Sequence, residues 1–419
     1  MSVFLQLAFL LSIILLAAKT AGYLSTRIGQ PSVLGELIVG ILLGPSLLNL
    51  FGISFIAHEL SEFIRLFGEM GVLLLMFLAG LEFQFDDLRD NMRVAVFSGT
   101  MGVVGPVLLG WGTGLLFGMT HAAALFLGLT LGATSVSISA QTLMELKVLR
   151  TRVGLSLLGA AIFDDILIIL LLSVFLAFLG GGGGGGLDIL LIIIRMAGFI
   201  VLSVMFGMRI LPWIIRRVSK LQISQGLLSV SLVTMFTYSI ASEYAGGLAA
   251  ITGAFIAGLM LARTPEKERI ETGVHAMAYG LFVPVFFVQI GLSINLRGFP
   301  PQALLFTSAL VLVAIIGKWL GAGLGAKLGG LSGRESVQLG AGMISRGEVG
   351  LIAASIGISN KLVGTNEFSA IVVMILVTTL ITPPILRALF ARKDVKGQEI
   401  HLEAGQGRAS SEAVELEAS

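Results

Sequence analysis

Residues 153–179 read VGLSLLGAAIFDDILIILLLSVFLAFL, an apolar run that is long enough to cross a bilayer as a helix. Two adjacent carboxylates, Asp164 and Asp165, interrupt the run near its middle. At the centre of a spanning helix each charge costs about 2.5–3.5 kcal/mol on insertion scales, and neighbouring carboxylates also repel one another. Packing gives no reason for such a pair, so the stretch predicts a transmembrane helix that carries a proton or ion site.

The composition of the whole chain is typical of a protein with many membrane spans. Of its 419 residues, 56% are hydrophobic and only 12% are charged, whereas a soluble domain has about 25% charged residues. The absence of cysteine excludes disulfides and thiolate metal sites, and four scattered histidines argue against a zinc site. The net charge of +2 gives no field that would attract nucleic acid. We therefore expect a polytopic membrane protein with no nucleic-acid partner.

Apolar segments of about 20 residues recur along the chain and are separated by short polar loops. We predict thirteen spans, at residues 3–18, 32–50, 63–81, 94–118, 121–140, 153–179, 187–208, 223–241, 246–262, 276–293, 302–325, 335–357 and 367–388. No basic residue precedes the first of them, as it would in a cleaved signal peptide, so we expect this helix to be retained. The predicted fold is an all-α polytopic membrane protein with about 13 transmembrane helices.

The loops between the predicted spans are alternately rich and poor in basic residues, and most of the 27 Lys and Arg side chains lie in the basic set of loops. Before the C-terminal tail, this crowded set consists of Lys19, Arg27, Arg89, Arg93, Lys147, Arg150, Arg152, Arg209, Arg216, Arg217, Lys220, Arg263, Lys267, Arg269, Lys327, Arg334 and Arg387. By the positive-inside rule the crowded side is cytoplasmic. With thirteen spans, the N-terminus is then outside and the C-terminus is in the cytoplasm.

Two glycine-rich stretches resemble nucleotide-binding loops but lack their context. The seven glycines at 180–186 are not followed by Lys-Ser/Thr, so they predict a flexible linker. Gly321, Gly323 and Gly325 lie inside an apolar span with no preceding strand, which favours tight helix packing. The polar tail from about residue 394 to residue 419 is typical of disorder.

Further charges lie inside the predicted spans and need partners there. They are Lys318, Arg346, Glu348 and, less deeply placed, Arg195. At 1.5 Å per residue, Asp164 lies about 16 Å from the cytoplasmic start of its helix and Lys318 about 11 Å from the cytoplasmic end of its own. These similar depths allow an ion pair between Asp164 and Lys318. The alternative interpretation is a structural ion pair without transport chemistry.

Two spans contain polar interruptions at corresponding places. In the fifth span, Thr134 and Ser135 follow Gly132, and in the twelfth, Arg346 and Glu348 flank Gly347. The triplets of spans four to six and eleven to thirteen enter the membrane from opposite sides, so we predict inverted repeats with two crossed broken helices around a midplane site. Alternatively, the hydroxyl groups bond back to their own helices. We expect Arg346 and Glu348 mainly to stabilise the core, and their second interpretation is as supporting residues of the site.

The order and spacing of several motifs together resemble a known family. They are Gln30-Pro31 leading to Glu36 and Gly44-Pro45, Phe77-Leu-Ala-Gly-Leu-Glu82, Ala133-Thr-Ser-Val-Ser-Ile-Ser-Ala140, Gly159-Ala-Ala-Ile-Phe-Asp-Asp165, Gly317-Lys318 and Arg346-Gly-Glu348. The chain resembles bacterial sodium/proton antiporters of the cation:proton antiporter superfamily, in the NapA-like branch. The resemblance covers spans two to thirteen.

The resemblance implies two domains. Dimerisation-domain helices would occupy 1–93 and 223–300, the core domain 94–179 and 301–390, the glycine loop and a linking helix 180–222, and a disordered cytoplasmic tail 391–419. The expected assembly is a homodimer in the bacterial cytoplasmic membrane.

The resemblance also implies roles for the charged residues. Asp165 would bind the transported Na⁺, beside Asp164, which would pair with Lys318, and Thr134, Ser135, Arg346 and Glu348 would support the site. The exchange of sodium or lithium for protons would be electrogenic, with Na⁺ and H⁺ as cargo and no cofactor. The chain would not be an enzyme. Alternatives are a potassium/proton antiporter or potassium-efflux system, a cation channel, and a sensor that binds a cation without moving it.

Overall fold

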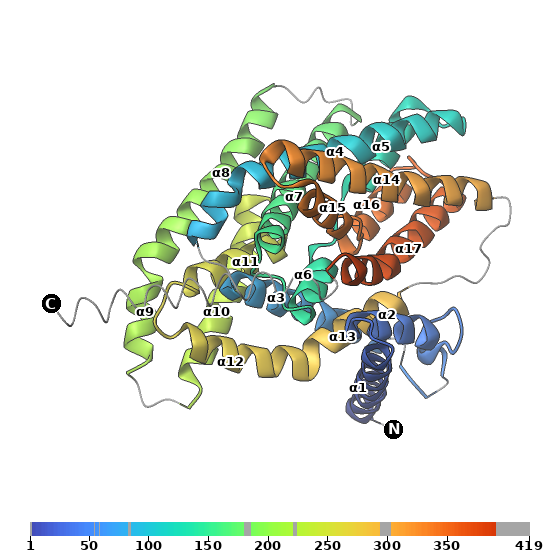
Figure 1. The fold of residues 1–419 in the computed structure, drawn as a ribbon. Helices are drawn as coiled ribbons and strands as arrows, with labels where there is room; N and C mark the ends of the chain where they lie inside the picture. The colour runs from blue at the N-terminus through green and yellow to red at the C-terminus, as the bar shows by residue number, and fades with distance from the viewer. Residues whose placement is uncertain are drawn as a thin grey trace.

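The computed structural model describes residues 2–53, 55–57, 59–82, 85–179, 186–220, 224–293 and 303–390. Within these ranges the regular secondary structure is helical, with connecting turns and no strand (Figure 1). The first part contains α1 Val3–Arg27, α2 Ser32–Leu43, η1 Leu50–Gly52, α3 Leu60–Glu82, α4 Phe85–Leu116, α5 His121–Gly132, α6 Val136–Glu145, α7 Arg152–Leu179, α8 Gly186–Arg209 and α9 Leu211–Val218. The remainder contains α10 Gly226–Ala241, η2 Ser242–Gly246, α11 Ala250–Leu261, α12 Lys267–Met277, η3 Ala278–Phe282, α13 Val283–Leu292, α14 Leu304–Gly329, α15 Gly333–Gly342, α16 Glu348–Ser359 and α17 Thr365–Leu389.

The predicted all-helical membrane fold is confirmed. Nine stretches within the described ranges are long and apolar enough to cross a membrane. Each of the thirteen predicted segments overlaps one of these stretches or shorter helices such as α2 and α11. The exact number of spans stays a prediction. The glycines at 180–185 and the tail 391–419 lie outside the described residues.

Two helix boundaries differ from the sequence prediction for physical reasons. α1 continues to Arg27 instead of ending near residue 18, since the charge of Lys19 is accommodated: its Nζ donates to the Tyr279 carbonyl at 2.9 Å. α2 ends at Leu43 instead of reaching residue 50, because Gly44 is extended and the following Pro45 disfavours helical geometry before it.

Both predicted helix breaks are present. The fifth predicted span is α5 and α6, separated by extended backbone at Ala133–Ser135. The twelfth is α15 and α16, separated by non-helical backbone at 344–347. The chain therefore exposes the ends of four short helices inside the bundle, where their backbone groups need partners.

The helices pack in two main groups (Figure 1). In one group, α4 packs against α5, α7 and α14, and α17 packs against α14, α15 and α16. In the other, α2 packs against α1 and α13, and α3 packs against α11 and α13. α8 lies along one side of the molecule, at the left of Figure 1, and contacts α11 and η2. The division into core and dimerisation domains stays a prediction.

The glycines of the GxGxG run serve close helix packing, as the sequence analysis favoured. A Cβ placed at Gly325 would lie 2.2 Å from the Phe97 carbonyl oxygen of α4, and one at Gly321 would lie 2.5 Å from that of Met101. Both distances are far shorter than a van der Waals contact. α14 can therefore approach α4 this closely only because these positions have no side chain.

Candidate functional site

The centre of the molecule holds a buried ion pair between α7 and α14. The Lys318 ammonium lies 2.9 Å from each carboxylate oxygen of Asp164, and both side chains are 0% exposed. Thr134, in the break between α5 and α6, donates its hydroxyl hydrogen to the same carboxylate. Lys318 also donates to the Gly132 carbonyl at 2.6 Å, at the end of α5. One lysine thus joins three elements that are far apart in the sequence.

Asp165 is the neighbour of Asp164 on α7, and its side chain is only 6% exposed. Successive residues of an α-helix point about 100° apart, so the two carboxylates leave the helix in different directions. Asp165 still lies close enough to Lys318 to interact with it electrostatically. The two aspartates therefore share one buried environment.

Arg346 is fully buried in the second helix break, and its described partners are backbone carbonyls. Its Nε and Nη2 donate to Leu131 O at 3.2 and 2.7 Å, Nη2 also donates to Ala314 O at 3.0 Å, and Nη1 donates to Ile344 O at 2.5 Å. The carbonyls at a helix C-terminus carry partial negative charge and have no partner within their own helix. Arg346 therefore satisfies the C-terminal end of α5 and the exit from α15.

The two helix breaks contact each other directly. The Ser135 amide donates to Ser345 O at 2.9 Å, and the Ser345 hydroxyl donates to Ser135 O at 2.8 Å. The Ser139 hydroxyl lies 3.0 Å from that of Ser345 and donates to Gly342 O at 2.5 Å. These reciprocal bonds satisfy backbone groups that the breaks leave open. Ser139 lies in the serine-rich motif of the fifth span, but the sequence analysis assigned no role to it or to Ser345.

The predicted site residues are thus distributed as follows. Asp164, Lys318 and Thr134 meet directly, Asp165 lies beside them, and Ser135 and Arg346 line the crossing of the two breaks. Glu348 begins α16, and its side chain lies outside the described residues. Where side chains are described, no group of three or more His, Cys, Asp or Glu is placed to hold a metal ion.

A second polar cluster lies between α6 and the N-terminal helices, and the sequence analysis missed it. The Glu145 carboxylate accepts hydrogen bonds from the Ser32 amide and hydroxyl at 2.5 and 2.6 Å, and from Gln141 at 2.8 Å. The Tyr279 hydroxyl donates to Gln141 at 2.7 Å. Ser32 begins α2, so Glu145 of α6 caps the N-terminus of α2.

An all-helical membrane bundle with buried charges at two crossed helix breaks is the architecture of a secondary transporter. The chain matches the family model described as "Sodium/hydrogen exchanger, transmembrane" over residues 12–392. It therefore belongs to the sodium/hydrogen exchanger family, whose members are membrane transporters and not enzymes.

Individual relatives agree with this membership. The chain is 43% identical over 382 residues to the probable Na⁺/H⁺ antiporter GerT of Bacillus cereus, covering 91% of this chain and 99% of GerT. It is 41% identical to the Na⁺/H⁺-K⁺ antiporter GerN of the same species, covering 92% and 97% of the two chains. It is 37% identical to a Na⁺/H⁺ antiporter of Enterococcus hirae, covering 90% and 96%.

The fold is also found in a solved structure. The sodium proton antiporter MjNhaP1 of Methanocaldococcus jannaschii superposes with a TM-score of 0.66 at 18% identity, covering 92% of this chain and 97% of MjNhaP1. The expected fold and the resemblance to sodium/proton antiporters are therefore confirmed.

Proposed function

We propose that this protein exchanges Na⁺ for H⁺ across the membrane, with Asp165 as the residue that alternately binds the cation and a proton. The observation that carries the proposal is the Lys318–Asp164 pair at the crossing of the two helix breaks. Lys318 lies against both oxygens of Asp164, and Thr134 donates to it as well. In the sodium/proton antiporters that the chain resembles, the second aspartate of such a pair binds the cation, and here that residue is Asp165. The names of the relatives support Na⁺ and H⁺ as the cargo.

The exchange follows from competition for buried carboxylates. A proton and a sodium ion neutralise the same negative charge, so each excludes the other. Sodium arriving at Asp165 would displace its proton and would also attract the Asp164 carboxylate away from Lys318. A buried ammonium that loses its carboxylate partner releases a proton readily. Two protons would then leave for each sodium ion bound, which makes the exchange electrogenic.

Alternating access would move one packing group relative to the other. The two helix breaks are bonded to each other through Ser135 and Ser345, which favours movement of the whole site as one unit. We assign α4–α7 and α14–α17 to this moving core and α1–α3 and α10–α13 to a stationary domain that forms the homodimer. The Glu145–Ser32 bonds cross the border between the two, so they would break when the core moves. We place the protein in the bacterial cytoplasmic membrane, with its N-terminus outside.

Transport by the purified protein in proteoliposomes tests this function. A Na⁺ gradient should drive proton movement, and an opposing membrane voltage should slow it. A channel would instead pass current with no cation gradient applied, and a sensor would bind the cation without any flux. Lys318→Gln should abolish the exchange or make it independent of voltage, and unchanged voltage-dependent exchange by this variant would contradict the role of Lys318.

Potassium is the second candidate cation. It is favoured by the 41% identity to GerN, which is named a Na⁺/H⁺-K⁺ antiporter. Proton flux measured in turn with Na⁺, Li⁺ and K⁺ distinguishes these cargoes. The proposal of sodium exchange fails if only K⁺ drives proton movement.

A further inference from the structure

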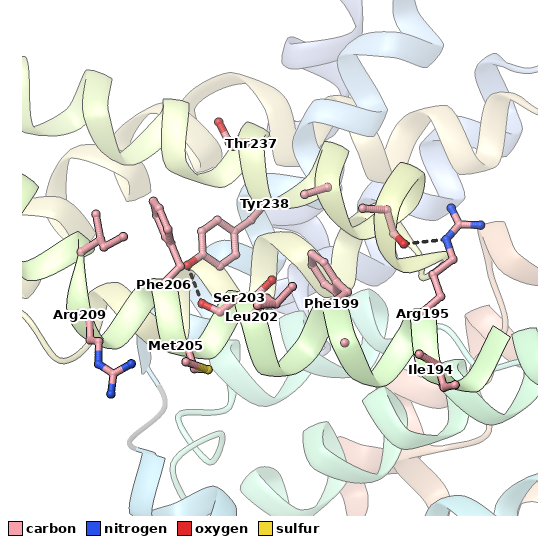
Figure 2. A pocket seen from close by; sticks show the side chains of 14 residues that line it. Ile194, Arg195, Phe199, Leu202, Ser203, Met205, Phe206, Arg209, Thr237 and Tyr238 are labelled. Carbon is pink, nitrogen blue, oxygen red and sulfur yellow. Dashed lines mark hydrogen bonds between the residues drawn. The ribbon is translucent and has the colours of Figure 1, made fainter. Parts of the chain in front are cut away.

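We propose that a groove between α8 and α10 binds one anionic phospholipid of the cytoplasmic leaflet, with an acyl chain along the groove and the headgroup phosphate on a basic cluster at its end. The groove is a cavity of about 750 Å³ that opens to the outside of the bundle. Its walls include Phe199, Leu202, Met205, Phe206 and Tyr238 (Figure 2). No contact of the site residues described above involves this groove.

The Thr237, Tyr238 and Arg195 side chains of the groove already have hydrogen-bond partners within the protein, so this part of its surface suits a hydrocarbon chain. The Tyr238 hydroxyl donates to Ser203 O at 2.9 Å (Figure 2). The Thr237 hydroxyl donates to Val233 O at 2.8 Å. At the far end, the Arg195 guanidinium donates to Ala245 O at 2.6 Å and also to Tyr244 O. Arg195 thus holds η2 against α8.

The opposite end of the groove is different. Arg209 lines both the groove and a second cavity of about 600 Å³, which is also lined by Trp213, Arg216, Arg217 and Lys220. We call Arg209, Arg216, Arg217 and Lys220 the basic cluster. None of these four side chains forms an ion pair with a carboxylate among the residues that the structure describes. The apolar groove therefore continues directly into a concentration of positive charge that no carboxylate of the described residues neutralises.

The position of the basic cluster fits a headgroup. Trp213 is exposed beside it, and the Arg217 guanidinium lies over its ring at 4.9 Å. Exposed tryptophans in membrane proteins mark the level of the headgroups. The cluster is on the predicted cytoplasmic side, where basic pockets next to membrane helices bind anionic lipid headgroups. From Arg209 to Ile194 the groove follows about 22 Å of helix. The hydrocarbon of one leaflet is roughly 15 Å deep, so the groove is long enough to hold an acyl chain over that whole depth.

These features favour a phospholipid over a second copy of the chain or a soluble anion. A soluble anion would not use the apolar groove. A second copy of the chain with a flat surface would not put an acidic group on the basic cluster and also fill a long groove with hydrocarbon. The combination of one apolar channel with one cationic end matches an acyl chain joined to a phosphate.

Native mass spectrometry of the full-length protein in detergent, titrated with dioleoyl phosphatidylglycerol or dioleoyl phosphatidylcholine, tests the proposal. The wild-type protein should bind phosphatidylglycerol at least tenfold more tightly than phosphatidylcholine. The triple variant Arg209→Gln, Arg216→Gln, Arg217→Gln should lose this preference. The matched control Arg27→Gln, Arg269→Gln, Lys327→Gln removes three exposed basic groups from the same predicted side and should keep it.

A second variant tests the groove itself and does not depend on the basic cluster. Gly198 lines the groove, and a Cβ placed there meets no atom within 4 Å, so the side chain of Gly198→Trp begins in open space and occupies the groove. It should weaken binding of phosphatidylglycerol at least tenfold while the melting temperature stays near that of the wild type. The proposal is overturned if the triple variant keeps its preference, if Gly198→Trp binds lipid as the wild type does, or if Gly198→Trp dissociates an oligomer without changing lipid binding.

Discussion

The Lys318 ammonium lies 2.9 Å from both carboxylate oxygens of Asp164, and neither side chain is exposed. The same ammonium donates to Gly132 O at the end of α5. The pair therefore neutralises two buried charges and also connects α7 and α14 to the first helix break. A change at either residue should affect stability as well as transport.

The first prediction concerns the stability of this pair. Lys318→Gln leaves the Asp164 carboxylate buried without its cation, which costs about 3–5 kcal/mol when one partner of a buried pair is removed. The double variant Lys318→Gln, Asp164→Asn removes both charges and keeps polar groups of similar size, so it should recover much of that loss. Melting temperatures of the purified variants check this. A double variant no more stable than Lys318→Gln would contradict the structural pairing.

The second prediction concerns Arg346, which donates to the carbonyls of Leu131, Ala314 and Ile344. Arg346→Gln offers fewer donors and no charge, so at least one buried carbonyl loses its partner at a cost of about 1–3 kcal/mol. Arg346→Lys keeps the charge and three donors but not the planar fork. We expect the melting temperature to fall for both variants and further for Gln. Two variants as stable as the wild type would show that the helix ends do not need this residue.

The third prediction concerns the contact of α4 with α14. The methyl group of Gly325→Ala would lie 2.2 Å from the Phe97 carbonyl oxygen, so α14 and α4 must move apart. Overpacking of this kind costs about 1–3 kcal/mol. Gly112→Ala on α4 is the control, because a Cβ there meets no atom within 4 Å. Thermal unfolding of both variants compares them directly, and equal melting temperatures would contradict the close packing.

The fourth prediction concerns alternating access. The chain has no cysteine, so Ser32→Cys with Glu145→Cys gives a single engineered thiol pair. A short bifunctional thiol reagent that joins them should reduce transport at least tenfold, since α2 and α6 are then held together, and reduction of a cleavable reagent should restore it. The uncrosslinked double variant is the control. Full transport by the crosslinked protein would exclude movement between these two helices.

Much of this architecture was predictable from the sequence, because single residues determine it. Gly132 and Gly347 with their polar neighbours locate the two helix breaks, and the helical rise places Asp164 and Lys318 at similar depth. Buried charges in lipid need partners, so similar depth allows this pair, whereas the choice of Asp164 over Asp165 came only from the family resemblance.

Other contacts gave no signal because their partners are neutral or distant. The Ser345–Ser135 bond joins residues 210 positions apart, and the Glu145–Ser32 bonds join residues 113 positions apart. Serine is common in helices, and a glutamate near a helix end is usually solvated, so neither residue stands out in the sequence. The groove between α8 and α10 was likewise missed, because both segments are uniformly apolar and their relative placement depends on tertiary packing.

The most direct test of the central claim is sodium-driven proton flux by Asp165→Asn in proteoliposomes, with the membrane voltage recorded. The amide has nearly the same shape but can neither take up a proton nor neutralise a sodium ion. We predict that this variant remains folded and loses sodium-dependent proton movement. Full sodium-dependent, voltage-sensitive flux by Asp165→Asn would contradict the assignment of the ion-binding site.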